Sequence, residues 1–247
     1  MTDASPVNAV DGARPLGSVA VAVDVLAGAV AQALSGMGAA FRLSELVGGW
    51  ADPVVGLGAV RVLGADALTP FLFTGNPLSA RDVEVVQAAI RVFPAPHRED
   101  PGDARVWRWR DWALGEVLAH LGVSKPAGDQ AAALDSGGED GFAGEPAWPG
   151  WSAAVSRLSV LASPAVSGPV REQVRRRRRD TWRGLARAML RHDHLSAARL
   201  ARWLALDAAV SSESLLDAAL SHLELFTAPP PRVRLEIVLA RRLWEGS

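Results

Sequence analysis

The sequence predicts an all-α protein, built as a helical bundle or an irregular array of antiparallel helices in one or two packed units. Three observations predict this class. Apolar residues recur three and four positions apart along most of the chain, which is the period of an α-helix. Glycine- and proline-rich stretches separate these segments, and capping residues such as Ser79 and Gly122 mark the ends of individual helices.

Residues 1–15 have no hydrophobic period, and we expect a disordered or loosely docked tail. The first helix follows, because seven apolar residues from Val19 to Phe41 are spaced three or four apart on one face. The overlapping stretch 17–40 is also long enough to span a membrane. However, it contains Asp24, which would cost about 2.5 to 3.5 kcal/mol near the centre of a bilayer. We therefore expect a core helix and no membrane span.

Residues 43–77 contain six glycines and three prolines, so any helices there must be short. The apolar run 54–63 fits either a strand or a buried helical turn. Ser79 has the character of an N-cap residue, with acids following in the first turn of a helix that stops before Pro94. A tryptophan-rich helix is expected over 103–121, closed by Gly122 as its C-cap.

Residues 125–149 combine five glycines with five acids, a composition that favours an acidic linker. We place the domain boundary there, between an N-terminal helical domain of residues 16–124 and a C-terminal helical domain of residues 150–247. The C-terminal part should form a short helix from Trp151, a long helix over 170–191, a turn over 192–195 and a return helix over 196–206. Two further helices are expected, over about 212–226 and 233–244.

Composition excludes some classes of function. The chain has no cysteine, so disulfides, thiolate metal sites and a cysteine nucleophile are impossible. Its formal net charge is −1, which gives no sign of a polyanionic partner. The 26 basic residues include one lysine only, a skew that indicates GC-rich coding, as in a GC-rich bacterium. We expect a cytoplasmic protein.

Two clusters are candidates for partner contacts. The run of arginines at 175–179 would suit an acidic protein surface or phosphate groups, although a solvated helix face has the same composition. The segment 107–112 interleaves tryptophans with arginines, a composition that suits core edges and interfaces and also stacking on bases. The residues predicted to bind a partner are Trp107, Trp112, Arg175, Arg176 and Arg179.

No catalytic residue, cofactor site or metal site is predicted. His192 and His194 are two residues apart at a helix turn and cannot share one helical face, and the hydrolase and phosphate-loop motifs are absent. The leading hypothesis is a non-enzymatic helical adaptor or assembly protein that binds a protein partner or forms a homo-oligomer. One alternative is a nucleic-acid-binding regulator that uses the arginine-rich helix. The other is a small-molecule enzyme with a pocket in the glycine-rich region 47–77.

Overall fold

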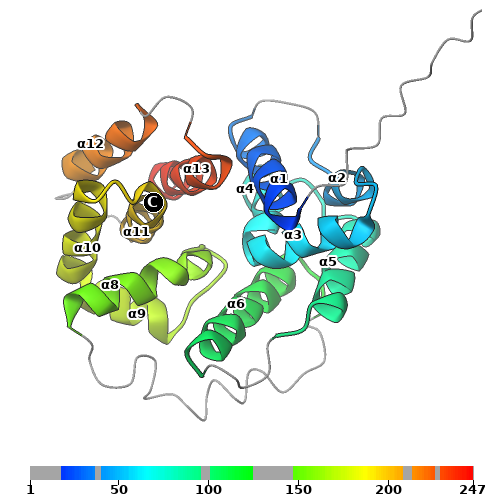
Figure 1. Cartoon of the computed structure of the whole chain (residues 1–247), viewed down its shortest axis with the longest axis horizontal. Helices are drawn as coiled ribbons and strands as arrows, with labels where there is room; N and C mark the ends of the chain where they lie inside the picture. The colour runs from blue at the N-terminus through cyan, green and yellow to red at the C-terminus, as the bar shows by residue number, and fades with distance from the viewer. Residues whose placement is uncertain are drawn as a thin grey trace, which may run out of the picture.

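The computed structural model describes residues 18–36, 40–95, 101–124, 147–207, 213–225 and 229–246, and all regular elements in these ranges are helices (Figure 1). The fold is therefore all-α, as predicted. The predicted tail 1–15 and residues 125–146 of the predicted linker lie outside the described residues. The N-terminal part contains α1 (Val19–Leu34), α2 (Leu43–Gly48), α3 (Pro53–Leu63), the 3₁₀ helix η1 (Gly64–Leu68), α4 (Thr69–Thr74), α5 (Ala80–Val92) and α6 (Pro101–His120).

The C-terminal part begins with α8 (Trp148–Arg157), whose first two residues are the last two of the predicted linker. It continues with the 3₁₀ helix η2 (Ser159–Leu161), α9 (Pro169–Arg176), α10 (Arg178–Leu190), α11 (His194–Leu206), α12 (Glu213–Glu224) and α13 (Pro231–Glu245).

Helix α1 is shorter than its apolar pattern predicted. Ser18 caps its start by accepting a hydrogen bond from the N–H of Val21, and the helix ends at Leu34, shortly before Gly36 with its φ of 70°. Phe41, which was expected on the same helical face, lies beyond this end. Its buried ring instead packs edge-on against Phe71 at 5.5 Å between ring centroids. The pattern extended further than the helix because apolar loop residues also enter the core.

The glycine-rich region 47–77 forms short helices, and the ambiguous run 54–63 is helix α3. Gly56 and Gly58 permit close packing, because a Cβ atom on either would lie 3.0 Å from Val47 or Val19. The stretch 53–74 is long and apolar enough to cross a membrane, but 78% of its most apolar part is buried inside the molecule. This degree of burial is typical of core helices in soluble proteins.

The predicted ends of α5 and the predicted C-terminal end of α6 are confirmed, whereas α6 begins at Pro101, two residues before the predicted start at residue 103. Ser79 and Asp82 form a capping box at the start of α5, in which each side chain bonds the backbone of the other. Asp82 also accepts a 2.7 Å hydrogen bond from the N–H of Ser44, so the cap fixes α2 against α5. After α6, Gly122 adopts a φ of 81°, the left-handed conformation for which glycine is favoured.

The long helix predicted over 170–191 is instead two helices, α9 and α10, separated at Arg177. Arg177 leaves helical geometry with φ −101° and ψ 28°. In this position its guanidinium lies 4.5 Å from the Trp151 ring centroid and bonds Asp180. No glycine or proline marks the break, and these two contacts with other residues account for it.

The helical hairpin of α10 and α11 is confirmed, with its turn at residues 191–193. His192 has a φ of 56°, and the N–H of Asp193 bonds back to the carbonyl of Ala188. Asp193 then caps α11 by accepting a hydrogen bond from the N–H of Ser196. A histidine therefore occupies the left-handed position at a helix end that glycine usually fills.

The two parts of the chain meet along α13, which packs against α11 on one side and α1 on the other (Figure 1). Arg242 of α13 donates hydrogen bonds to the carbonyl of Leu34 at the end of α1. Helix α6 also reaches both parts, since it contacts η1 and η2. The buried apolar residues form one continuous core, while the assignment of residues 16–124 and 150–247 to separate domains stays a prediction.

Candidate functional site

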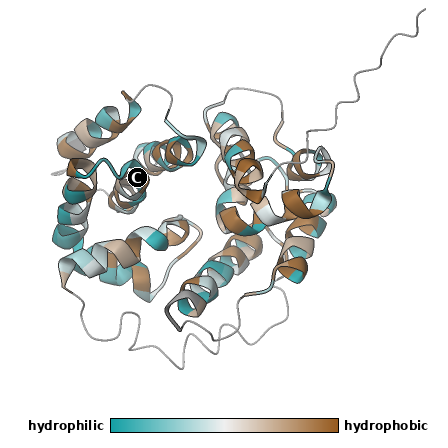
Figure 2. Cartoon of the chain, viewed as in Figure 1, coloured by the Kyte–Doolittle hydropathy of each residue, from teal (hydrophilic) through white to brown (hydrophobic). Residues whose placement is uncertain are grey.

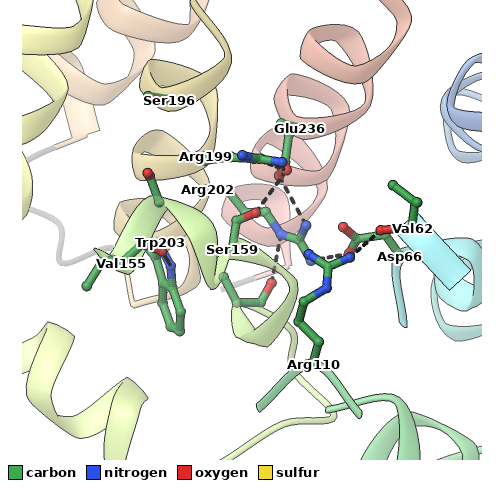
Figure 3. A network of polar contacts seen from close by, with 12 residues as sticks. Val62, Asp66, Arg110, Val155, Ser159, Ser196, Arg199, Arg202, Trp203 and Glu236 are labelled. Atoms are coloured by element: carbon green, nitrogen blue, oxygen red, sulfur yellow. Dashed lines mark hydrogen bonds and ion pairs between the residues drawn. The ribbon is translucent and has the colours of Figure 1, made fainter. Parts of the chain in front are cut away.

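A network of buried ionic residues lies where the two parts of the chain meet (Figure 3). At its centre is Arg202 of α11, with only 1% of its side chain exposed. Its guanidinium donates hydrogen bonds to Asp66 of η1 at 2.8 Å, to Glu236 of α13 at 3.1 Å and to the carbonyl of Ala162 at 2.9 Å. Residues more than a hundred positions apart in sequence are therefore joined directly.

Glu236 is the most extensively bonded acid of this network. Its Oε1 atom accepts hydrogen bonds from the hydroxyl of Ser159 at 2.9 Å and from Arg199 at 3.2 Å, while Oε2 accepts from Arg202. Burial by itself would raise the pKa of Glu236, but Arg202 and Arg199 hold this pKa below its ordinary value. Glu236 is therefore an ionised, fully paired carboxylate.

Asp66 has fewer partners. Burial raises the pKa of Asp66 above its ordinary value, against the opposing attraction of Arg202. Arg110 of α6 approaches the same region and donates to the carbonyl of Val62 (Figure 3). Burial lowers the pKa of Arg110, while the charge of Asp66 acts in the opposite direction. Asp66, which accepts a hydrogen bond from Arg202 across the contact between the N-terminal and C-terminal parts, is therefore less well paired than Glu236.

Burial acts on Arg202 as well, and by itself it would lower the pKa of the guanidinium. The charges of Asp66 and Glu236 outweigh this effect and raise the pKa. Each of the three guanidinium nitrogens of Arg202 donates a hydrogen bond within the chain, and only 1% of the side chain is exposed to solvent. The network has the properties of a structural junction, in which paired charges fix the relative position of several helices.

A second ion pair adjoins this junction on α6. Arg61 of α3 pairs with Asp111 through two hydrogen bonds and donates a third to the carbonyl of Phe93 at 2.7 Å. The guanidinium of Arg61 also lies over the Trp107 ring, 4.6 Å from its centroid. The bonds from Arg61 therefore join α3 to the end of α5 at Phe93 and to α6 at Asp111.

Both tryptophans predicted to bind a partner are half-buried by their own chain. Trp107 lies beneath Arg61 and also near Arg110, at 5.5 Å. Trp112 stacks edge-on against Trp109 at 5.4 Å, and a Cβ atom on Gly168 would lie 2.9 Å from it. The structure therefore gives each ring an internal packing role, and the prediction that they bind a partner stays a prediction.

The three predicted arginines lie on the exposed surface of α9 and α10, away from both tryptophans. Side-chain exposure is 59% for Arg175 and 73% for Arg176, and both pair with Glu172. Arg179 is also exposed and forms no ion pair with another residue that the structure describes. Figure 2 shows that hydrophilic residues dominate α10 at this edge of the molecule. The arginines form a group, but Trp107 and Trp112 do not join it.

A cavity of about 550 Å³ opens beside α10, between this helix, α8 and α11. Sequence reasoning did not find it, because its walls come from three helices and contain ordinary small and polar residues. Gly184 marks its floor, since a Cβ atom there would lie 2.3 Å from the Cβ atom of Ser152. The lining residues are Pro149, Gly150, Ser152, Ala153, Ser156, Gly184, Arg187, Ala188, Arg191, Asp193, Ser196 and Leu200.

No group of three or more histidine, aspartate or glutamate side chains in the described part of the chain is arranged to hold a metal ion. Comparison with models of known protein families, with curated proteins and with solved structures found no match. Functional arguments must therefore come from the geometry and charge of the molecule.

Proposed function

We propose that this protein is a non-enzymatic, cytoplasmic helical adaptor or assembly protein, and that the arginines of α9 and α10 bind an acidic face of a protein partner. One observation carries the proposal. The segment 169–190 contains eight arginines and only two acids, Glu172 and Asp180, although the whole chain has a net charge of −1. Such local concentration of one charge promotes binding of an oppositely charged surface.

The nearby acids are too few to neutralise this surface. Glu172 is shared by Arg175 and Arg176, and Asp180 is shared by Arg177 and Arg183. Asp207, at the end of α11, is shared by Arg171 and Arg175. Each carboxylate therefore faces two guanidinium groups. Arginine is also well suited to a protein interface, since its planar group can bond a carboxylate through two parallel hydrogen bonds.

An acidic protein is favoured over nucleic acid because the basic surface is confined to one helical region of a chain with balanced charge. Nucleic-acid-binding domains are usually strongly basic as a whole, with an isoelectric point above about 9, whereas the isoelectric point of this chain is about 6.5. The internal bonding of Arg202 and Glu236 supports a structural role for these buried charges.

The proposal is tested by affinity capture from nuclease-treated lysate of the native host, with the full chain as bait. We expect R175E/R176E/R179E to lose proteins that the wild type retains, because three attractive charges become repulsive. The matched control is R81E/R91E/R234E, which reverses three exposed arginines on α5 and α13. Circular dichroism should show equal helix content in all three proteins.

Retention of the same proteins by the wild type and by R175E/R176E/R179E would show that the arginine surface is only solvated. If the bound material disappears on nuclease treatment and direct binding to duplex DNA weakens steeply with salt, the nucleic-acid alternative replaces the adaptor. A protein lost only from the α9–α10 variant, and recovered as a direct complex of the purified components, supports the proposal.

A further inference from the structure

We infer that the cavity between α8, α10 and α11 binds a small organic anion, a phosphate or carboxylate attached to a hydroxyl-bearing body. This site is separate from the proposed partner surface at Arg175, Arg176 and Arg179. Its cavity of about 550 Å³ lies within the range of small-molecule sites, which is roughly 300 to 1,000 Å³.

Two arginines border the cavity: Arg187 of α10 and Arg191, the C-cap residue that follows this helix. They are four residues apart, so their Cβ atoms lie about 5 to 6 Å from each other on one side of the helix. Two guanidinium groups at this spacing can contact the same anionic group from neighbouring positions. Neither forms an ion pair with a residue that the structure describes, and both side chains are exposed.

The two positive charges repel each other when no anion is present, and an anion between them would remove this repulsion. The helix dipole accounts for a cation near the end of α10. It does not account for two cations at the edge of one cavity. Arg187 is also held in place, since its guanidinium lies 5.7 Å from the centroid of the Trp148 ring.

The opposite wall suits the polar body of such a ligand. Ser152, Ser156 and Ser196 provide hydroxyl groups, and Asp193 provides a carboxylate that can accept hydrogen bonds from hydroxyls. Leu200 is the only large apolar side chain among the residues that line the cavity. Ser152 and Ser156 already donate hydrogen bonds to backbone carbonyls of α8, and Asp193 accepts one from the N–H of Ser196. Their remaining lone pairs can still accept hydrogen bonds, so the lining suits a ligand that carries hydroxyl groups.

The start of α8 adds to the positive potential. Pro149 and Gly150 belong to its first turn, and the N-cap residue Ala147 offers no side-chain acceptor. The partial positive charge of this helix end therefore faces the cavity. Helix α11 also begins at the cavity, but the carboxylate of Asp193 caps its N-terminus, so this helix end adds little positive potential.

Isothermal titration calorimetry with the full chain tests the inference, with glucose 6-phosphate and citrate as probes. Glucose and inorganic phosphate represent the separate halves of the first probe. We expect one of the two organic anions to bind more tightly than inorganic phosphate, and glucose not to bind. R187Q/R191Q should weaken that binding at least about tenfold, because two charge-assisted contacts are lost. The control R81Q/R234Q should change it by less than about twofold.

A second variant separates the cavity from surface charge. Ala153 lines the cavity and is exposed, so A153F fills part of the space, keeps both arginines and should be tolerated by the fold. Loss of binding in both A153F and R187Q/R191Q supports the site. Wild-type affinity in A153F would overturn it, because binding would then depend on exposed arginines alone. Absence of binding by both organic anions up to about 10 mM would also overturn it.

Discussion

Replacing Arg202 with methionine should destabilise the protein strongly, because it removes one cation from two buried carboxylates. Arg202 supplies the guanidinium that bonds Asp66, and it is one of two arginines that bond Glu236. Methionine fills most of the volume but donates no hydrogen bond. Removal of one member of a buried ion pair costs about 3 to 5 kcal/mol. In a chain of this size that corresponds to a melting temperature lower by roughly 6 to 20 °C.

The loss should depend on pH in a specific direction. Without Arg202, the pKa values of Asp66 and Glu236 in the folded protein move upward, since burial then acts with less opposition. A carboxyl group whose pKa is higher in the folded than in the unfolded state gains stability as the pH falls toward its folded pKa. Each such group contributes up to about 1.4 kcal/mol per pH unit. The destabilisation by R202M should therefore be at least about 1 kcal/mol smaller at pH 5 than at pH 7.

Urea denaturation followed by tryptophan fluorescence measures both effects, and R234M provides the control because Arg234 is exposed on α13. R234M should change the free energy of unfolding by no more than about 0.5 kcal/mol. The triple variant R202M/D66N/E236Q, which carries no charge at these positions, should recover part of the lost stability. The reasoning is refuted if R202M costs no more than R234M, or if its cost is equal at the two pH values.

Three further predictions concern single elements, each checked by urea denaturation. G184A should lower the free energy of unfolding by about 1 to 3 kcal/mol, because its Cβ atom would overlap Ser152. G115A, with open space around the new Cβ atom, should be neutral or stabilising. Equal effects of the two substitutions would contradict the packing argument. H192G should stabilise the protein by about 0.5 to 1 kcal/mol, because glycine tolerates the φ of 56° at this turn, and a loss of stability would contradict this. D82A should cost about 1 to 3 kcal/mol at pH 7. Burial would raise the pKa of Asp82, but hydrogen bonds from Ser79 and Ser44 hold this pKa below its ordinary value. The cost of D82A should therefore disappear as the pH falls below the pKa of the Asp82 carboxyl group in the folded protein. A cost that does not change with pH would contradict this.

Local interactions explain why much of the fold could be predicted from the sequence. Helices α1, α5, α6 and the α10–α11 hairpin follow from apolar spacing and from short-range signals such as Ser79 and Gly122. The break at Arg177 could not be predicted in this way. It accompanies contacts with Trp151 and Asp180, and only the Asp180 contact is close in sequence.

The candidate sites were less accessible to sequence reasoning. The exposed arginines were recognisable as a charge run. Arg187 was not singled out because it lies alone between uncharged neighbours, and Arg191 drew notice only as part of the turn with His192 and His194. For Asp66, Arg202 and Glu236, one signal was present: each is a charged residue with an apolar residue directly before and after it in the sequence. That signal does not identify their partners, which come from η1, α11 and α13.

The sequence by itself determined the helical class, several helix ends and the concentration of arginine over 169–190, because periodicity, capping and charge are properties of neighbouring residues. Only the tertiary structure decided that Trp107 and Trp112 pack within the chain, that Arg202 joins Asp66 to Glu236, and that three helices enclose a polar cavity. These features depend on the relative positions of helices far apart in sequence. The spacing of residues along one helix does not specify which other helix will cover it.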